Sequence, residues 1–408
     1  MGLYLGVFLV TLSGLMLEIG LTRIFSATIW YHFAFVAISV ALLGWGAGGF
    51  VLHVSRARIA FTRERAALLT LLYGLSIPLA LWLIVRLPFH PERLPFYFAV
   101  SLVPFLLAGM ALSMLFAIEK RNAGRLYFAD LVGASMGSLL VSGRIRFAQY
   151  LEQARERVDP VFDDRPFFFA RQKPWGLPRS MQLGFGQILA PILVLCALLL
   201  VSGKPRGQPV GPYAASLLFF ASLGTGFIAV ELSLLQHLTL LLGHPIFTLS
   251  ILLFTLLASG GLGSASDGRR PLRDVCLAVG VLAAAYALAL PRVVPALLPL
   301  PLGLRIAIAI AVIAPLGFLM GMPFPRGLRA TGQGPFPAPS FYWGLNGIFS
   351  VVGSMATMVA AVVAGFTWAM LGGAAFYLLA ALASLAFGSA PGDARGASAG
   401  RKGEAYGS

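Results

Sequence analysis

Twelve apolar runs, each close to the length of a membrane-spanning helix, dominate this sequence. A helix needs about 20 apolar residues to cross the hydrocarbon core of a bilayer. The runs occupy residues 3–22, 33–53, 66–86, 97–117, 126–143, 182–202, 213–235, 245–264, 274–291, 303–322, 341–362 and 366–388. Strands cross a bilayer only as a closed barrel, and these runs lack the alternation of barrel strands. The sequence therefore predicts an all-α, polytopic bundle of about 11–12 transmembrane helices.

The scarcity of charge points to the same class of protein. Hydrophobic residues make up 58% of the chain and charged residues 11%, against about 45–50% and about 25% in soluble proteins. This composition excludes a soluble enzyme, a disordered protein and a fibrous one. The net charge of +15 comes from short basic clusters between the apolar runs. We expect membrane lipid to be the partner of these clusters, and we expect no nucleic-acid binding.

Basic clusters also predict the orientation of the chain. They follow the even-numbered runs, at Arg56–Arg65, Lys120–Arg125, Lys204–Arg206, Arg269–Arg273 and Arg326–Arg329. The positive-inside rule then places both termini in the cytoplasm, and we expect an inner-membrane protein. Residues 142–180 do not fit, because they carry eight Arg or Lys on the side that this count puts outside. Either 126–143 does not span the membrane or this segment follows other rules.

The second half of the sequence repeats features of the first at an offset of about 211–216 residues. Glu18 matches Glu231, Arg23 falls opposite Gln236, and Asp130 matches Asn346; Pro104 and Gly109 likewise match Pro315 and Gly321. Because these matches keep their order, the sequence predicts a duplication. The two repeats are expected to be parallel and related by an axis along the membrane normal, as in two-lobed transporters.

This duplication sets the expected domain organisation. We predict a first transmembrane repeat at 1–141, a short polar segment at 142–180, a linking transmembrane helix and loop at 181–212, a second repeat at 213–388 and a disordered tail at 389–408.

Two glutamates inside apolar runs are the leading site candidates. Glu18 and Glu231 lie at equivalent places in the two repeats, and a charge at the centre of a transmembrane helix costs roughly 2.5–3.5 kcal/mol on insertion scales. We expect both side chains to face the bundle interior, with Arg23 and Gln236 beside them. One interpretation is a site for a cation or a proton. The other is a pair of buried carboxylates that fixes helix packing.

Other polar residues are secondary candidates. Asp130 and its counterpart Asn346 favour a structural role, although Asp130 also lies in an apolar run. His32 and His244 follow the two glutamate-bearing runs and suit the membrane surface, while His237 lies six residues after Glu231. No close pair of histidines or carboxylates has the spacing of a metal site. We expect no metal.

The sequence contains no recognisable catalytic motif. Gly44–Gly49 resembles a dinucleotide-binding fingerprint but lies inside an apolar run, without a preceding strand. Small residues at such spacing let transmembrane helices approach closely, as do Gly133 with Gly137 and Gly317 with Gly321. The two cysteines, Cys196 and Cys276, suggest neither a disulfide framework nor zinc. We therefore expect no cofactor and no catalytic residues.

Several short motifs together resemble one known family. They are Leu-Glu-Ile-Gly-Leu-Thr-Arg-Ile-Phe-Ser (17–26), Trp-Tyr-His-Phe-Ala-Phe (30–35), Leu-Leu-Gly-Trp-Gly-Ala-Gly-Gly (42–49), Tyr-Phe-Ala-Asp-Leu-Val-Gly-Ala (127–134), Asp-Asp-Arg-Pro-Phe-Phe-Phe (163–169), Leu-Gly-His-Pro (242–245) and Phe-Leu-Met-Gly-Met-Pro-Phe-Pro (318–325). In these motifs the chain resembles the membrane-integrated spermidine-synthase-like proteins, in which a transporter-like bundle is fused to a synthase domain. The synthase domain is missing here, and the resemblance makes 142–180 its remnant.

The resemblance implies three alternative functions. The first is a non-catalytic membrane bundle that binds or moves a small ligand, such as a polyamine or another organic cation. The second is a scaffold or partner subunit for a separately encoded synthase-like enzyme. The third is an aminopropyltransferase, which the absence of a cofactor loop and of catalytic residues opposes.

Overall fold

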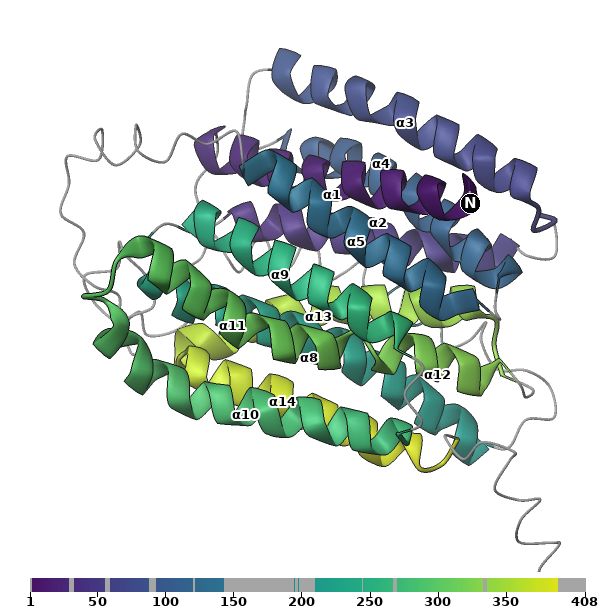
Figure 1. Ribbon diagram of the computed structural model, residues 1–408. Coiled ribbons are helices and arrows are strands. Elements are labelled where there is room, and N and C mark those ends of the chain that lie inside the picture. The colour runs from purple at the N-terminus through teal and green to yellow at the C-terminus, as the bar shows by residue number, and fades with distance from the viewer. Residues whose placement is uncertain are drawn as a thin grey trace, which may run out of the picture.

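The computed structural model describes residues 2–28, 33–55, 59–87, 93–119, 122–142, 194, 197, 210–243, 245–266, 270–332 and 336–387. These residues are nearly all helical, and none of them lies in a strand. The helices are α1 (Gly2–Thr28), α2 (Phe33–Ser55), α3 (Arg63–Arg86), α4 (Leu94–Ile118), α5 (Ala123–Ser142), α8 (Val210–Leu242), α9 (Pro245–Ala265), α10 (Leu272–Leu297), α11 (Leu302–Met320), α12 (Pro323–Thr331), α13 (Pro339–Ala364) and α14 (Phe366–Ser384). Figure 1 shows a bundle of roughly aligned helices, so the predicted all-α fold is confirmed.

Eleven of the twelve apolar runs coincide with these helices. Within the described residues, nine helices are long and apolar enough to cross a membrane, and α2 contributes a shorter apolar stretch. The run at 182–202 lies outside the described residues except for positions 194 and 197, and so do 143–180 and the predicted tail at 389–408. The orientation of the chain and its location in an inner membrane stay predictions.

The outer helices carry their apolar side chains outward, as expected in lipid. On α3, Leu75 is 61% exposed and Val85 is 73% exposed, while Tyr73 on the other face is buried. Leu288 on α10 and Trp368 on α14 are exposed in the same way. An exposed apolar surface of this extent is unusual for a protein in water and ordinary for one in a bilayer.

Local chemistry fixes several helix ends. The Thr62 hydroxyl accepts a hydrogen bond from the Arg65 backbone N–H at 3.3 Å and so caps α3. Gly243 and Gly365 have φ angles of 83° and 93°, a region that side chains with a Cβ rarely adopt. Gly243 therefore ends α8, and Gly365 lets the chain turn directly from α13 into α14.

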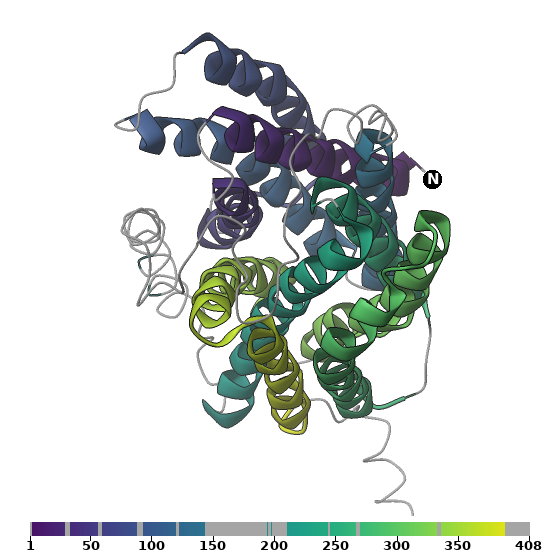
Figure 2. The ribbon, with the colours of Figure 1, turned by 90° about the vertical axis from the view of Figure 1, so that its left-hand side faces the viewer.

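The two halves of the chain pack in the same pattern. α1 packs against α5 and α2 against α4, as α8 packs against α13 and α9 against α11. The halves meet where α2 packs on α13 and α5 on α9, which are matching pairs under the predicted repeat. Figures 1 and 2 both show the helices of residues 2–142 gathered on one side of the molecule. This pattern agrees with the duplication, which itself stays a prediction.

Glycines allow the closest helix crossings. A Cβ at Gly133 would overlap the backbone of Phe8, so α5 lies directly on α1. The Gly44–Gly49 segment does the same within α2: Gly48 abuts the backbone of α4, and Gly46 abuts the backbone of α13. The segment is thus a helix-packing surface, as the sequence predicts.

One polar cluster joins the ends of three helices of the first half. The Arg63 guanidinium at the start of α3 lies 2.6 Å from the Glu119 carboxylate that follows α4. The Asn122 side-chain amide, just before α5, donates to the other Glu119 oxygen at 3.1 Å. The hydrogen bond from Asn122, followed by that from Arg63, holds the pKa of Glu119 below its ordinary value of 4.5.

Replacing Glu119 by Gln should therefore lower stability in a pH-dependent way. Because the pKa of Glu119 is depressed in the folded protein, its contribution is present above the ordinary pKa and is lost as pH falls through the folded value. The Arg63 side chain is 67% exposed, so solvent screens the pair and we expect a loss of at most about 1 kcal/mol near neutral pH. Thermal unfolding in detergent should show a difference at about pH 7 that shrinks below about pH 4. A difference independent of pH would contradict this assignment.

Candidate functional site

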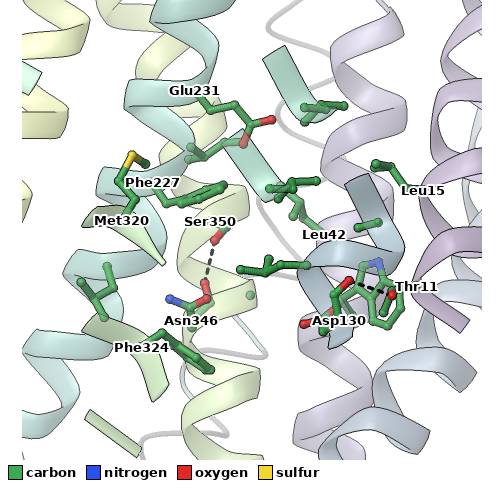
Figure 3. A pocket seen from close by; sticks show the side chains of 18 of the residues that line it. Thr11, Leu15, Leu42, Asp130, Phe227, Glu231, Met320, Phe324, Asn346 and Ser350 are labelled. Carbon is green, nitrogen blue, oxygen red and sulfur yellow. Dashed lines mark hydrogen bonds between the residues drawn. The ribbon is translucent and has the colours of Figure 1, made fainter. Parts of the chain in front are cut away.

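A cavity of about 230 Å³ lies between the two halves of the bundle. Both halves of the bundle contribute to its wall (Figure 3). The first half contributes α1, α2 and α5, and the second contributes α8, α9, α11, α12, α13 and α14. Its lining residues are Thr11, Leu15, Glu18, Ile38, Leu42, Trp45, Tyr127, Asp130, Leu131, Ala134, Leu223, Phe227, Ile228, Glu231, Leu253, Leu257, Met320, Phe324, Trp343, Asn346, Gly347, Ser350 and Tyr377.

Three carboxylates line this cavity, and no basic side chain among the described residues does. Glu18 comes from α1, Asp130 from α5 and Glu231 from α8. All three side chains are half-buried. The carboxyl groups of Glu18 and Glu231 are close enough to interact electrostatically, although they lie 213 positions apart in the sequence. The cavity therefore concentrates negative charge.

Helical periodicity brings these residues to one wall. Thr11, Leu15 and Glu18 follow one another at the spacing of a single helix face, and all three line the cavity. On α8, Phe227 and Glu231 are one turn apart and line it as well. The same face of two corresponding helices thus presents a glutamate to the same space.

Asp130 and Asn346 lie where their own helices meet α1 and α8. The Thr11 hydroxyl donates to the backbone carbonyl of Asp130 at 2.8 Å. The Asn346 side-chain amide donates to the backbone carbonyl of Phe220 at 3.2 Å, and the Ser350 hydroxyl donates to the backbone carbonyl of Asn346 at 2.9 Å. Figure 3 shows Asp130 and Asn346 on opposite sides of the same region of the cavity.

The three carboxylates have no compensating partner in the described structure. No described residue donates a hydrogen bond to the side chain of Glu18, Asp130 or Glu231, and none forms an ion pair with them. Burying even part of a carboxylate without a partner is unfavourable. A bound cation or a bound proton would remove this penalty.

Aromatic side chains form much of the remaining wall. Tyr127 packs against Phe324 with ring centroids 5.4 Å apart, and Phe324 packs edge-on against Trp343 at 5.6 Å. Trp45 and Tyr377 also line the cavity. The face of an aromatic ring attracts a cation within about 6 Å. These rings and the carboxylates therefore favour the same kind of ligand.

The structure brings together some of the residues that the sequence singles out and not others. Glu18, Glu231, Asp130 and Asn346 share the cavity. The side chains of Arg23, Gln236 and His237 are not part of its lining, and His32 and His244 lie outside the described residues. Arg23 keeps two guanidinium nitrogens buried without a hydrogen-bond partner among the described residues, so it does not neutralise Glu18. A ligand-binding role for any of these residues stays a prediction.

Sequence reasoning missed the aromatic wall. Tyr127 and Trp343 fall in the paired stretches Tyr127-Phe128 and Tyr342-Trp343 of the predicted repeat, which is the one signal that could have marked them. Trp45 and Phe324 fall in the motifs 42–49 and 318–325, but the sequence assigns them no role in a site, and nothing in the sequence marks Tyr377. Their position depends on how the helices cross.

The described residues do not form a recognisable metal site. No group of three or more His, Cys, Asp or Glu in the described part of the chain is arranged to hold a metal. The walls between the carboxylates are aliphatic and aromatic, whereas a metal ion needs several oxygen, nitrogen or sulfur ligands at once.

Comparison with known proteins gives fold-level similarities only. No protein-family model matches this chain, and no curated protein matches it. Two similar solved structures are of the fucose:proton symporter FucP. The first, an alanine variant from E. coli, is 12% identical with a TM-score of 0.47 and covers 95% of this chain and 97% of that chain. The second, a major facilitator superfamily transporter in the outward conformation, is 13% identical with a TM-score of 0.48 and covers 94% and 99%.

The human organic anion transporter MFSD10 is also similar, with 14% identity and a TM-score of 0.48 over 94% of this chain and 97% of that chain. Identities and scores at this level assign neither a family nor an activity to this protein.

The resemblance to spermidine-synthase-like proteins is wrong. No family model or curated protein supports it, and the similar solved structures are transporters. Glycines in two of the motifs are helix-packing positions: Gly48 lies against α4, Gly46 against α13 and Gly133 against α1. Such small residues recur wherever membrane helices cross closely. The interpretation of 142–180 as the remnant of a synthase domain therefore loses its basis, and residues 143–180 lie outside the described residues. No finding supports a synthase partner.

Proposed function

We propose that this membrane protein binds a small organic cation in the cavity between its two halves and moves it across the bilayer. Glu18 and Glu231 are the charged partners of the ligand, and the aromatic wall holds its apolar part. The observation that carries the proposal is the gathering of three unpaired carboxylates, with no basic residue among the described lining.

The charge and the walls of the site support this ligand class together. An ammonium group between Glu18 and Glu231 would replace their mutual repulsion with two charge-assisted hydrogen bonds. Tyr127, Phe324 and Trp343 offer aromatic surface against which the apolar part of the ligand can pack. An anion would meet repulsion from every ionised group of the described lining.

The position of the cavity supports movement as well as binding. Its wall is divided between the two halves, with Glu18 on one and Glu231 on the other. A ligand that contacts both glutamates would therefore feel any change in how the halves pack. Midplane sites between two halves are the common arrangement in transporters. Polyamines are members of this ligand class and belong in any substrate panel.

The ligand class can be tested with three molecules of the same shape and different charge. Purified protein in detergent should bind benzylamine, a cation near neutral pH, at least about tenfold more tightly than neutral benzyl alcohol. Benzoate, the corresponding anion, should not bind measurably. In proteoliposomes, labelled benzylamine or labelled spermidine should accumulate by a saturable process. Equal binding of the alcohol or the anion would overturn the proposal.

A further inference from the structure

The carboxylates of the cavity lie at two separate levels along the helices. Thr11 and Glu18 share one face of α1 and are seven residues apart. At 1.5 Å per residue this is a rise of about 10 Å. The Thr11 hydroxyl contacts the backbone carbonyl of Asp130, so Asp130 lies at the Thr11 level and Glu18 lies about 10 Å further along.

The second half has the same spacing. Gly224 of α8 packs directly against the backbone carbonyl of Asn346, and Glu231 is seven residues further along the same helix. Asn346 therefore lies about 10 Å from the level of Glu231. Figure 3 shows this arrangement, with Glu231 at one end of the cavity and Asp130 and Asn346 at the other.

Apolar side chains separate the two levels. Leu15 lies between Thr11 and Glu18 on α1, and Phe227 lies between Gly224 and Glu231 on α8; both line the cavity. Leu42 and Met320 extend this apolar zone in Figure 3. A charged group would find no partner there.

The Asp130 level keeps acceptor atoms for a ligand. No described residue donates to the Asp130 carboxylate. The Asn346 amide nitrogen already donates to Phe220, which leaves the amide oxygen of Asn346 as an acceptor. Tyr127, close enough to interact electrostatically with Asp130, adds a ring that packs on Phe324. This level can therefore hold a second ammonium group.

We propose that the ligand is an elongated dication, with two amino groups joined by an apolar spacer. One amino group binds at Glu18 and Glu231, the spacer lies along Leu15 and Phe227, and the other amino group binds at Asp130 and the Asn346 oxygen. Asp130 is then the residue that distinguishes dications from monocations. This inference rests on the proposed organic-cation site and specifies which cation it takes.

A chain-length series tests the inference. Linear α,ω-diaminoalkanes of about four to twelve carbons, and the n-alkylamines of equal length, are used to displace labelled benzylamine from purified protein. The diamines should show an optimum length and bind about tenfold or more tightly than the matched monoamine there, because only a spacer that fits both levels gains the second ion pair. Asp130→Asn should remove this advantage, so that each diamine binds no more tightly than the monoamine of equal length. The matched control Asp274→Asn, at an exposed position on α10, should keep it.

The predicted repeat supplies a rescue. Moving the carboxylate across the cavity with Asp130→Asn and Asn346→Asp together should restore the preference for diamines. Equal affinity of diamines and monoamines in the wild-type protein would overturn the dication inference and leave the cation site standing. A preference for diamines that is unchanged in Asp130→Asn would also overturn the dication inference. Failure of every amine to bind would overturn the proposed function itself.

Discussion

Replacing Glu18 and Glu231 together by Gln should abolish binding and uptake of organic cations while the protein still folds. Gln keeps the shape of Glu and most of its hydrogen-bonding capacity but removes the charge. Since no described residue pairs with either carboxylate, loss of the charge leaves no protein group without its partner. We expect affinity to fall by about 100-fold or more, which corresponds to about 2.7 kcal/mol.

The single variants and a matched control make this result specific. Glu18→Gln and Glu231→Gln should each weaken binding by about tenfold, because each leaves one carboxylate for the ligand. Glu64→Gln alters an exposed glutamate at the start of α3, away from the cavity, and should bind as the wild type does. Unchanged binding in the double variant would remove the site and leave the two glutamates as a structural pair.

Replacing Gly347 by Val should unfold the protein or prevent its assembly. Gly347 of α13 faces Gly46 of α2 where the two halves meet, and a Cβ at Gly347 would lie only 2.6 Å from the Gly46 Cα. A valine side chain there must separate two backbones rather than displace a flexible side chain. Overpacking of this kind typically costs about 1–3 kcal/mol and more where the backbone cannot move, so we expect about 3 kcal/mol or more.

A second glycine provides the control for this substitution. A Cβ at Gly74 of α3 would meet no heavy atom within 4 Å outside its own stretch of helix, and this glycine is exposed on the outer face of the bundle. Gly74→Val should therefore express and unfold as the wild type does. Size-exclusion profiles and thermal unfolding in detergent compare the two variants. Equal behaviour of Gly347→Val and Gly74→Val would show that the close contact between the halves does not hold the bundle together.

The helices can be predicted because hydrophobicity alone marks membrane spans. Their ends cannot. α1 continues to Thr28, beyond the apolar run that ends at residue 22. A polar residue at the end of this run does not stop the helix, because the Thr22 hydroxyl donates to the Glu18 backbone carbonyl at 2.8 Å. The apolar runs do not predict α12 as a separate helix, since only the position of Pro323 at its first turn signals a new start.

The candidate site is partly predictable for a similar reason. An ionisable residue in an apolar run is conspicuous, so Glu18 and Glu231 are easily found, and the repeat offset points to Asp130 and Asn346. Which side chains surround them depends on helix crossings that no local pattern specifies. Arg23 illustrates the difference: it is close to Glu18 in sequence, yet five residues along a helix place it away from the cavity lining.

The most direct test of a cation site between the two halves is to locate a bound cation. Crystals of the purified protein grown with a bromine-labelled benzylammonium ion would reveal the ligand by its anomalous signal. We expect the bromine inside the cavity lined by Phe324 and Trp343, with the ammonium group beside the carboxylates of Glu18 and Glu231. A ligand bound elsewhere on the protein, with this cavity empty, would contradict a cation site between the halves.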